Sequence, residues 1–203
     1  EHTVAGSYRY LMGVFDVDGD LMPDIFFENT SFTLGWIKNV DGNFITFTTI
    51  PDSYSPTQAK GIADFDQDGD TDMTLYFDDC CIKYFRNNSN GTFTVSSISS
   101  DEYQDEIIVT DTNDDGFADI VYHYASGYDV AVFNPVSDVF DSPTFFGTYY
   151  AIQTTFSDID GDGDDDFIVI SDEGVAGFYT LKYCENIGGF GTLTTLNDSI
   201  PEY

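Results

Sequence analysis

The sequence predicts an all-β protein built from four similar units, and three observations support this. An acidic motif recurs four times, with its first aspartates at positions 16, 64, 111 and 158, which are 48, 47 and 47 residues apart. A fixed period of this size indicates a repeat architecture. Each motif is followed by a run of strand-forming residues, and aromatic residues make up 17% of the chain. This composition favours a packed β-rich fold over a disordered acidic chain.

The second copy of the acidic motif is the most complete, and it reads D-F-D-Q-D-G-D-T-D from Asp64 to Asp72. Carboxylates this close together repel one another unless a cation lies between them. Calcium takes roughly six to eight oxygen ligands, and a tight loop can aim several carboxylates and one backbone carbonyl at the ion. Gly69 at motif position 6 allows a sharp turn, because glycine adopts a positive φ without steric cost. The motif therefore predicts a calcium-binding loop.

The predicted ligands are the side chains at motif positions 1, 3, 5 and 9, together with the backbone carbonyl of position 7. Loop by loop, the candidates are Asp16, Asp18, Asp20 and Asp24; Asp64, Asp66, Asp68, Asp70 and Asp72; Asp111, Asn113, Asp115, Phe117 and Asp119; and Asp158, Asp160, Asp162, Asp164 and Asp166. Up to four Ca²⁺ ions are expected. The first loop has Leu21 in place of glycine, at a cost on the order of 1 kcal/mol if φ is positive. The third loop has three carboxylates and should bind more weakly than the second and fourth.

Four short strands are expected in each repeat. Residues 25–27, 73–77, 120–124 and 167–170 follow the loops and are rich in residues that form buried strands. A second strand ends on Asn39, Asn87, Asn134 or Asn186, and turns such as Asp41-Gly42 then lead to a third. The fourth strand enters each loop, as in residues 11–15. Four antiparallel strands in about 47 residues match one propeller blade, which gives blades near 9–53, 58–102, 105–147 and 151–197.

The acidic loops, their period and the trailing segments W-I-K-N-V-D-G-N-F and Y-F-R-N-N-S-N-G-T-F-T resemble FG-GAP/VCBS repeats. These repeats form the β-propeller blades of integrin α-chain heads and of many secreted proteins. The resemblance implies one propeller domain over residues 1–203, with four blades of four antiparallel strands. The alternative is part of a seven- or eight-bladed propeller. In the family, the calcium loop joins the first two strands of a blade, and ligands usually meet loops on the opposite face.

An EF-hand is the main rival explanation for an aspartate-rich calcium loop. That site needs a bidentate glutamate at loop position 12. The residues at that position here are Phe27, Leu75, Tyr122 and Val169, none of which carries a carboxylate. The EF-hand interpretation therefore fails.

The charge of the chain excludes several classes of partner. Lys and Arg number 6 against 37 Asp and Glu, for a net charge of -31. This balance argues against binding to nucleic acid or to anionic membranes. No apolar run approaches the roughly 20 residues of a spanning helix, so no membrane insertion is expected. The chain begins at Glu1 without a signal-like segment, which suits a mature secreted protein or a piece of a longer one.

We expect an extracellular protein, secreted or on the cell surface, that acts in adhesion, recognition or assembly without being an enzyme. No catalytic motif is present, and His2 and His123 are expected to be structural. The partner would be an extracellular protein or glycan, or further copies of the chain. The alternative is a lectin-like propeller or the propeller domain of a secreted polysaccharide-degrading enzyme.

Three further sets of residues carry expectations. Asn29, Asn87, Asn90 and Asn197 lie in N-x-S/T sequons and are candidate glycosylation sites, as in a glycoprotein. Tyr54, Tyr103, Tyr149 and Tyr150 are candidates for a ligand-binding face opposite the calcium loops. The three cysteines, Cys80, Cys81 and Cys184, leave open one disulfide with a free thiol, an interchain bond or three free thiols.

Overall fold

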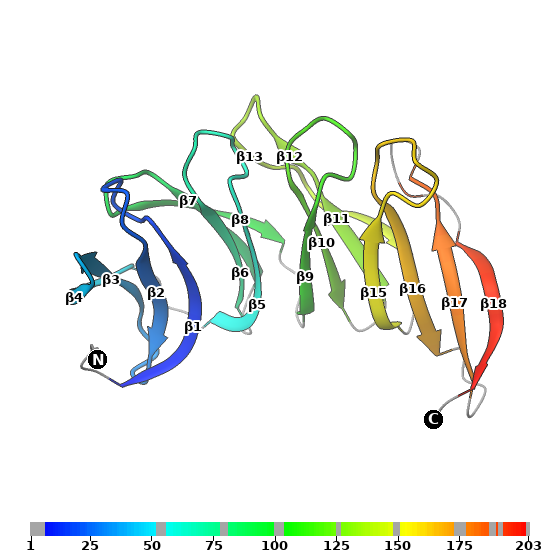
Figure 1. Ribbon diagram of the computed structural model, residues 1–203, viewed down its shortest axis with the longest axis horizontal. Coiled ribbons are helices and arrows are strands. Elements are labelled where there is room, and N and C mark those ends of the chain that lie inside the picture. Colours follow the sequence, from blue (N-terminus) through cyan, green and yellow to red (C-terminus); the bar gives the residue numbers. More distant parts are fainter. Residues whose placement is uncertain are drawn as a thin grey trace. The chain divides into compact units, whose positions relative to one another are not determined.

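The computed structural model describes residues 7–51, 56–77, 81–99, 104–124, 127–147, 151–172, 178–186, 190 and 193–201. These residues form four four-stranded antiparallel sheets and one two-stranded ribbon (Figure 1). The described part of the chain contains no helix, and thus none long and apolar enough to cross a membrane. The all-β class and the four-stranded repeat are confirmed. The chain divides into two compact units, residues 1–104 and 105–203, each holding two of the four-stranded sheets.

The first unit contains two four-stranded meanders. Blade 1 comprises β1 (Tyr8–Phe15), β2 (Asp24–Asn29), β3 (Leu34–Val40) and β4 (Asn43–Thr49), and blade 2 comprises β5 (Pro56–Ala63), β6 (Asp72–Phe77), β7 (Cys81–Asn87) and β8 (Phe93–Ser99). Strands within each blade pair in sequence order. Asp41 and Gly42 both have positive φ in the turn between β3 and β4, as expected of an Asp-Gly hairpin.

The two faces of a blade are used differently. In blade 1 we call the face with Ile25, Phe27 and Ile37 the front face, and the face with Phe26 and Trp36 the back face. Successive strand residues point to opposite faces, and Ile25 pairs with Ile37 as Phe26 pairs with Trp36. The back face of blade 1 packs on the front face of blade 2. This interface is a cluster of Met12, Phe15, Val17, Phe26, Leu34, Trp36 and Ile50 with Met73, Leu75, Phe77 and Phe85.

The second unit repeats this arrangement with one change. Blade 3 comprises β9 (Gln104–Thr110), β10 (Asp119–Tyr124), β11 (Gly127–Ala131) and β14 (Thr144–Gly147), with a ribbon of β12 (Phe133–Asn134) and β13 (Val139–Phe140). Blade 4 comprises β15 (Ala151–Ser157), β16 (Asp166–Asp172), β17 (Phe178–Cys184) and β18 (Thr194–Pro201). The back face of blade 3 contributes Val121, Tyr128 and Val130 to a cluster with Phe167, Val169 and Cys184 on the front face of blade 4.

The expected second strand of the third repeat, residues 131–134, is not continuous in the structure. β11 ends at Ala131, and Phe133 and Asn134 pair with β13 instead. Asn134 is followed by Pro135, which has no N–H to donate to a sheet. The chain turns there, with Asp138 N donating to the Asn134 carbonyl at 2.8 Å.

Two of the three cysteines lie among the described residues. Cys81 forms a disulfide bond, whereas Cys184 is not in a disulfide and is buried in the core of the second unit. Cys80 lies outside the described residues.

Truncation of Phe85 tests the interface between blades 1 and 2. Its side chain is fully buried, and its ring lies 6.0 Å from that of Phe77. We expect Phe85→Ala to lower the free energy of unfolding by about 3–5 kcal/mol, because a large cavity replaces the ring. Val136→Ala is the control, since Val136 is 95% exposed, and it should change stability by less than about 0.5 kcal/mol. Urea unfolding measures both, and similar losses in the two variants would contradict the packing.

Candidate metal centres

The four aspartate loops share one backbone conformation. Each loop joins the first and second strands of its blade, at residues 16–23, 64–71, 111–118 and 158–165. Positions 4 and 6 have positive φ in every copy. The values are Gly19 77°, Gln67 58°, Asp114 55° and Gly161 84° at position 4, and Leu21 68°, Gly69 98°, Gly116 86° and Gly163 109° at position 6.

The first loop keeps this shape despite lacking the position-6 glycine. Leu21 adopts the left-handed conformation of its glycine counterparts, with its side chain 90% exposed. The strain expected from the sequence is therefore present. It does not change the geometry of the loop.

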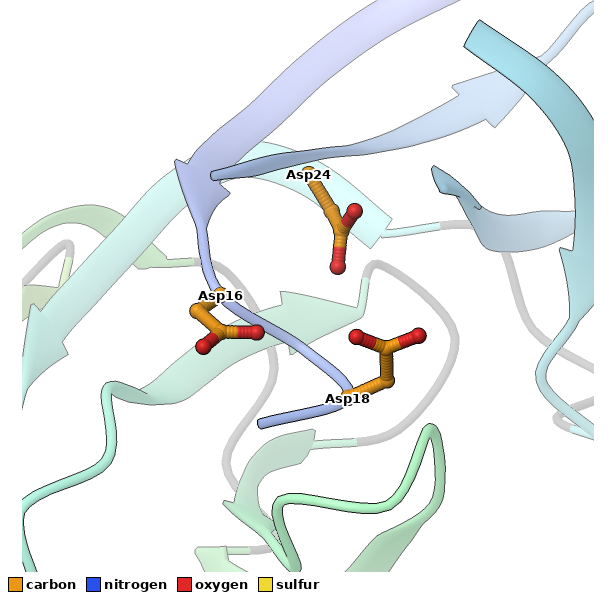
Figure 2. A group of neighbouring side chains, drawn as sticks. All are labelled: Asp16, Asp18 and Asp24. Carbon is orange, nitrogen blue, oxygen red and sulfur yellow. The ribbon is translucent and has the colours of Figure 1, made fainter. Parts of the chain in front are cut away.

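Carboxylate oxygens converge in three of the loops. The groups are Asp16, Asp18 and Asp24; Asp64, Asp66 and Asp72; and Asp158, Asp160 and Asp166, each with one oxygen per residue within 4.8 Å of the others. Figure 2 shows the first group, whose three side chains point toward a common space. In the third loop, position 3 is an amide, and Asn113 Nδ2 donates to Asp115 Oδ2 at 3.0 Å.

The aspartate at position 9 has a second role that the sequence motif did not indicate. Asp24, Asp72, Asp119 and Asp166 are all buried. One oxygen of each aspartate accepts a hydrogen bond from the backbone N–H at position 2 of its own loop. The other oxygen accepts one from a backbone N–H at or just after the end of β3, β7, β11 or β17. For Asp24 the donors are Val17 N at 3.0 Å and Asn39 N at 2.7 Å. The donors to the others are Phe65 and Asn87, Thr112 and Phe133, and Ile159 and Asn186.

Two of the asparagines that recur at the same place in each repeat connect neighbouring blades. Asn87 Nδ2 of blade 2 donates to the Asp16 carbonyl in the loop of blade 1 at 3.0 Å. Asn186 Nδ2, which follows β17 of blade 4, donates to the Thr112 carbonyl in the loop of blade 3 at 3.0 Å. Asn39 donates within its own blade, to the Pro23 carbonyl. The sequence showed an asparagine that closes the second strand of each repeat, but it did not specify which group that side chain contacts.

Burial and mutual repulsion shift the acidity of the loops. Burial, with the nearby charge of Asp66, raises the pKa of Asp72 to about 7, against hydrogen bonds that lower it. Desolvation and the charges of Asp162, Asp166 and Asp160 raise the pKa of Asp164 to about 6. Burial also raises the pKa values of Asp24 and Asp119. The protein environment by itself therefore disfavours the charged form of these carboxyl groups.

The donor chemistry fits a hard divalent cation. The convergent atoms are carboxylate oxygens, which calcium prefers. Asp18 Oδ1 and Asp164 Oδ1 are buried without a hydrogen-bond partner. Such atoms are rare in folded proteins unless an unseen ion or water satisfies them.

Basic side chains contact the first two loops, and the sequence motif did not predict them. Lys38 Nζ contacts Asp18 Oδ2 and lies 2.7 Å from Asp20 Oδ2. Arg86 Nε contacts Asp66 Oδ2, and its Nη2 lies 3.5 Å from Asp68 Oδ2. The hydrogen bond from Lys38 lowers the pKa of Asp20. A basic residue directly before the strand-ending asparagine was the available signal.

The remaining candidate residues are placed as follows. Tyr54, Tyr103, Tyr149 and Tyr150 lie outside the described residues, as does His2. Asn87 is fully buried, and a glycan on it would be incompatible with its bond to Asp16. Asn29 and Asn90 lie at partly or fully exposed positions, and Asn197 lies in β18. His123 packs its ring 4.7 Å from that of Tyr128.

Comparison with known proteins identifies the fold. No family model and no curated protein match the chain. Among solved structures, it is similar to BBS1N in complex with ARL6DN (TM-score 0.53, 13% identity, 96% of this chain and 56% of that one). It is also similar to the V. cholerae biofilm matrix protein Bap1 (0.51, 15%, 94% and 29%) and to the Dos1 propeller (0.50, 10%, 94% and 61%). The chain has a β-propeller fold and spans less than two thirds of each of these structures.

Two substitutions in the fourth loop separate the structural role of position 9 from metal binding. Asp166→Asn sets an amide N–H₂ against one of two backbone donors, so we expect a loss of about 1–3 kcal/mol even in excess chelator. Asp162→Asn, at position 5, removes a charge from the crowded loop and should cost nothing under those conditions. Thermal unfolding in chelator measures both. Equal stability of the two variants would contradict the structural role.

Proposed function

We propose that this chain is a calcium-stabilised, non-catalytic propeller module of an extracellular protein, built from FG-GAP/VCBS-type repeats. The observation that carries the proposal is the convergence of three aspartates at the same place in loops one, two and four. Repeated convergence of like charges, with buried oxygens left unpartnered, favours bound cations over a chance acidic surface.

The position of the loops supports the family resemblance. Each loop joins the first and second strands of its blade, where the calcium loop of FG-GAP/VCBS repeats lies. Sites of this kind in extracellular modules bind with affinities near about 0.1 mM, which suits the calcium concentration outside cells. The family resemblance gives two forms of the ring, four closed blades or part of a seven- or eight-bladed propeller.

Catalysis is not part of the proposal, because the clustered carboxylates would be committed to metal ions and to the backbone. A glycosidase would need one carboxyl group kept protonated in a cleft and a second one nearby. A bound calcium ion would lower the pKa of its ligands and keep them ionised. A glycan-binding face built from the four tyrosines stays the alternative function.

Removal of calcium tests the metal assignment. With about 1 mM calcium and affinities near 0.1 mM, each site adds about 1.4 kcal/mol of stability, and four add about 6 kcal/mol. That is comparable to the whole net stability of a typical domain. Excess chelator should therefore lower the melting temperature sharply, and added calcium should restore it.

Magnesium at equal concentration is the control, since it dehydrates reluctantly and prefers octahedral sites with several waters. Calorimetric titration of the metal-free protein should show up to four calcium sites. A melt unchanged by chelator would rule out the metal assignment.

A second observation favours assembly as the role of the module. Tyr8, Leu11, Ile25, Phe27 and Ile37 line an apolar cavity of about 230 Å³ at the front face of blade 1. Leu11 is 61% exposed and the adjacent Val14 57%. The matching residues of blade 2, which include Met73, Leu75 and Phe85, are fully buried against blade 1. In blade 1 itself, Phe27 and Ile37 are 3% and 5% exposed, so the exposed apolar part of the front face lies on β1, at Leu11 and Val14.

The surface that covers such a face within the chain is the back face of another blade. Blade 4 carries Ile168, Leu181 and Tyr183 at back-face positions, and all three are partly exposed. We assign the back face of blade 4 in a second copy as the occupant of the front face of blade 1. Such a head-to-tail contact is heterologous and can build rings or filaments. BBS1N is solved in complex with ARL6DN, and this chain would likewise have a protein partner.

Substitution of Leu11 tests this contact. Leu11→Asp places a charge in the proposed interface without disturbing a buried side chain, so it should weaken self-association while leaving the melt in calcium unchanged. Val136→Asp is the matched control, at an exposed valine of the second unit. Sedimentation velocity over a range of concentrations measures both. A wild-type protein that stays monomeric throughout would contradict the assembly.

A further inference from the structure

Loops one and two each contain a positive charge supplied by the chain itself. The Lys38 ammonium bridges Asp18 and Asp20, and the Arg86 guanidinium bridges Asp66 and Asp68. These aspartates occupy motif positions 3 and 5, which are predicted metal ligands. The two basic side chains are about one third exposed, whereas the side chain of Asp66 is 4% exposed. The ion pairs therefore reach from the surface into the loops.

Lys38 and Arg86 occupy equivalent positions in their repeats. Each directly precedes the asparagine whose backbone N–H donates to the buried position-9 aspartate, at 2.7 Å in both blades. That hydrogen bond holds the end of the strand against the loop. The preceding side chain is thereby carried to the same place over each loop.

The other two repeats have no cation at this position. In the third repeat Phe133 is itself the backbone donor to Asp119, and the residue directly before it is Val132. Glu185 stands there in the fourth repeat and is exposed. Loop four therefore gains no compensating charge from this position, and Asp164 Oδ1 in that loop is buried without a partner.

We propose that Lys38 and Arg86 are tethered cations that hold loops one and two in shape without metal and weaken calcium binding there. Loop four, which has Glu185 instead, is then the loop whose structure depends most on calcium. This inference rests on the proposed calcium binding. It makes the four sites unequal in a different order from the one that ligand count and the position-6 glycine predict, because loop two joins loop one among the weaker sites.

The basic side chains and a metal ion would compete for the same aspartates. An ion that entered loop one would meet the ammonium group on two of its ligands and would have to displace it or bind beside a like charge. Arg86 opposes an ion in the same way at loop two, through a planar guanidinium that suits carboxylate pairs. Asp18 Oδ1 stays unpartnered beside Lys38, so the ammonium leaves part of the ligand set free. The tethered cation therefore weakens a metal site without abolishing it.

The test combines loss and gain of the tethered cation. Lys38→Met together with Arg86→Met removes both charges and keeps the aliphatic length, whereas Glu185→Lys adds a cation to loop four. Melting in excess chelator and calorimetric calcium titration are measured for each protein. In chelator, the double variant should melt below wild type and Glu185→Lys above it. In calcium, two sites of the double variant should bind about tenfold more tightly, and one site of Glu185→Lys about tenfold more weakly, because ligand charge sets calcium affinity.

Lys83→Met is the matched control, since Lys83 lies on β7 three residues before Arg86 and packs over the ring of Phe77. It removes one positive charge away from the loops and should leave the calcium affinities unchanged. If the loss and gain variants kept the calcium affinities of wild type and its melting temperature in chelator, the proposed role of Lys38 and Arg86 would be wrong. Absence of calcium binding in every protein, including wild type, would instead overturn the proposed function, and the chelator melts would still decide whether the ion pairs stabilise the loops.

Discussion

The buried aspartate at the end of each loop is the interaction on which the rest of the structure depends. Its carboxylate accepts hydrogen bonds from the loop backbone and from the residue where the next strand ends or has just ended, as Asp166 does from Ile159 and Asn186. One side chain thus fixes the loop, the hairpin and their relative position. Burial of a carboxylate is costly unless its oxygens are satisfied. Here two backbone donors meet that requirement in all four blades.

The same hydrogen bonds relate the loops to the packing of neighbouring blades. Asn87 uses its backbone N–H for Asp72 in its own blade and its side chain for the loop of blade 1, and Asn186 does the same for blades 4 and 3. Each pair of blades is also joined by an apolar cluster between a back face and a front face. A change in loop geometry therefore acts on the interface between two blades. Under the proposed calcium binding, an ion in a loop would therefore also stabilise the contact between two blades.

The balance of charge differs among the four loops, although their backbone conformations are similar. All four loops concentrate negative charge, and the protein fold alone raises the pKa values of several of their carboxyl groups. The first two loops offset this with a basic side chain, and the fourth does not. Under the proposed calcium binding, a single residue outside the ligand set would set the metal dependence of a blade. The backbone need not change, because the position-9 aspartate sets it in every copy.

The sequence by itself determined the repeat, its strands and the loops, because these depend on local patterns. The period, the strand-forming runs and a glycine such as Gly69 specify conformation within a few residues. Even Leu21 adopts the positive φ of the glycines at the same motif position. Only the tertiary structure decided which groups satisfy the buried aspartates and that Asn87 reaches Asp16. It also decided that Lys38 and Arg86 each contact two aspartates of one loop. It also showed β11 ending early, before Pro135. Apart from the position-2 donors, which lie 7 residues from their aspartates, those contacts join residues 14 or more positions apart. Their formation depends on blade packing and register, which no local pattern encodes.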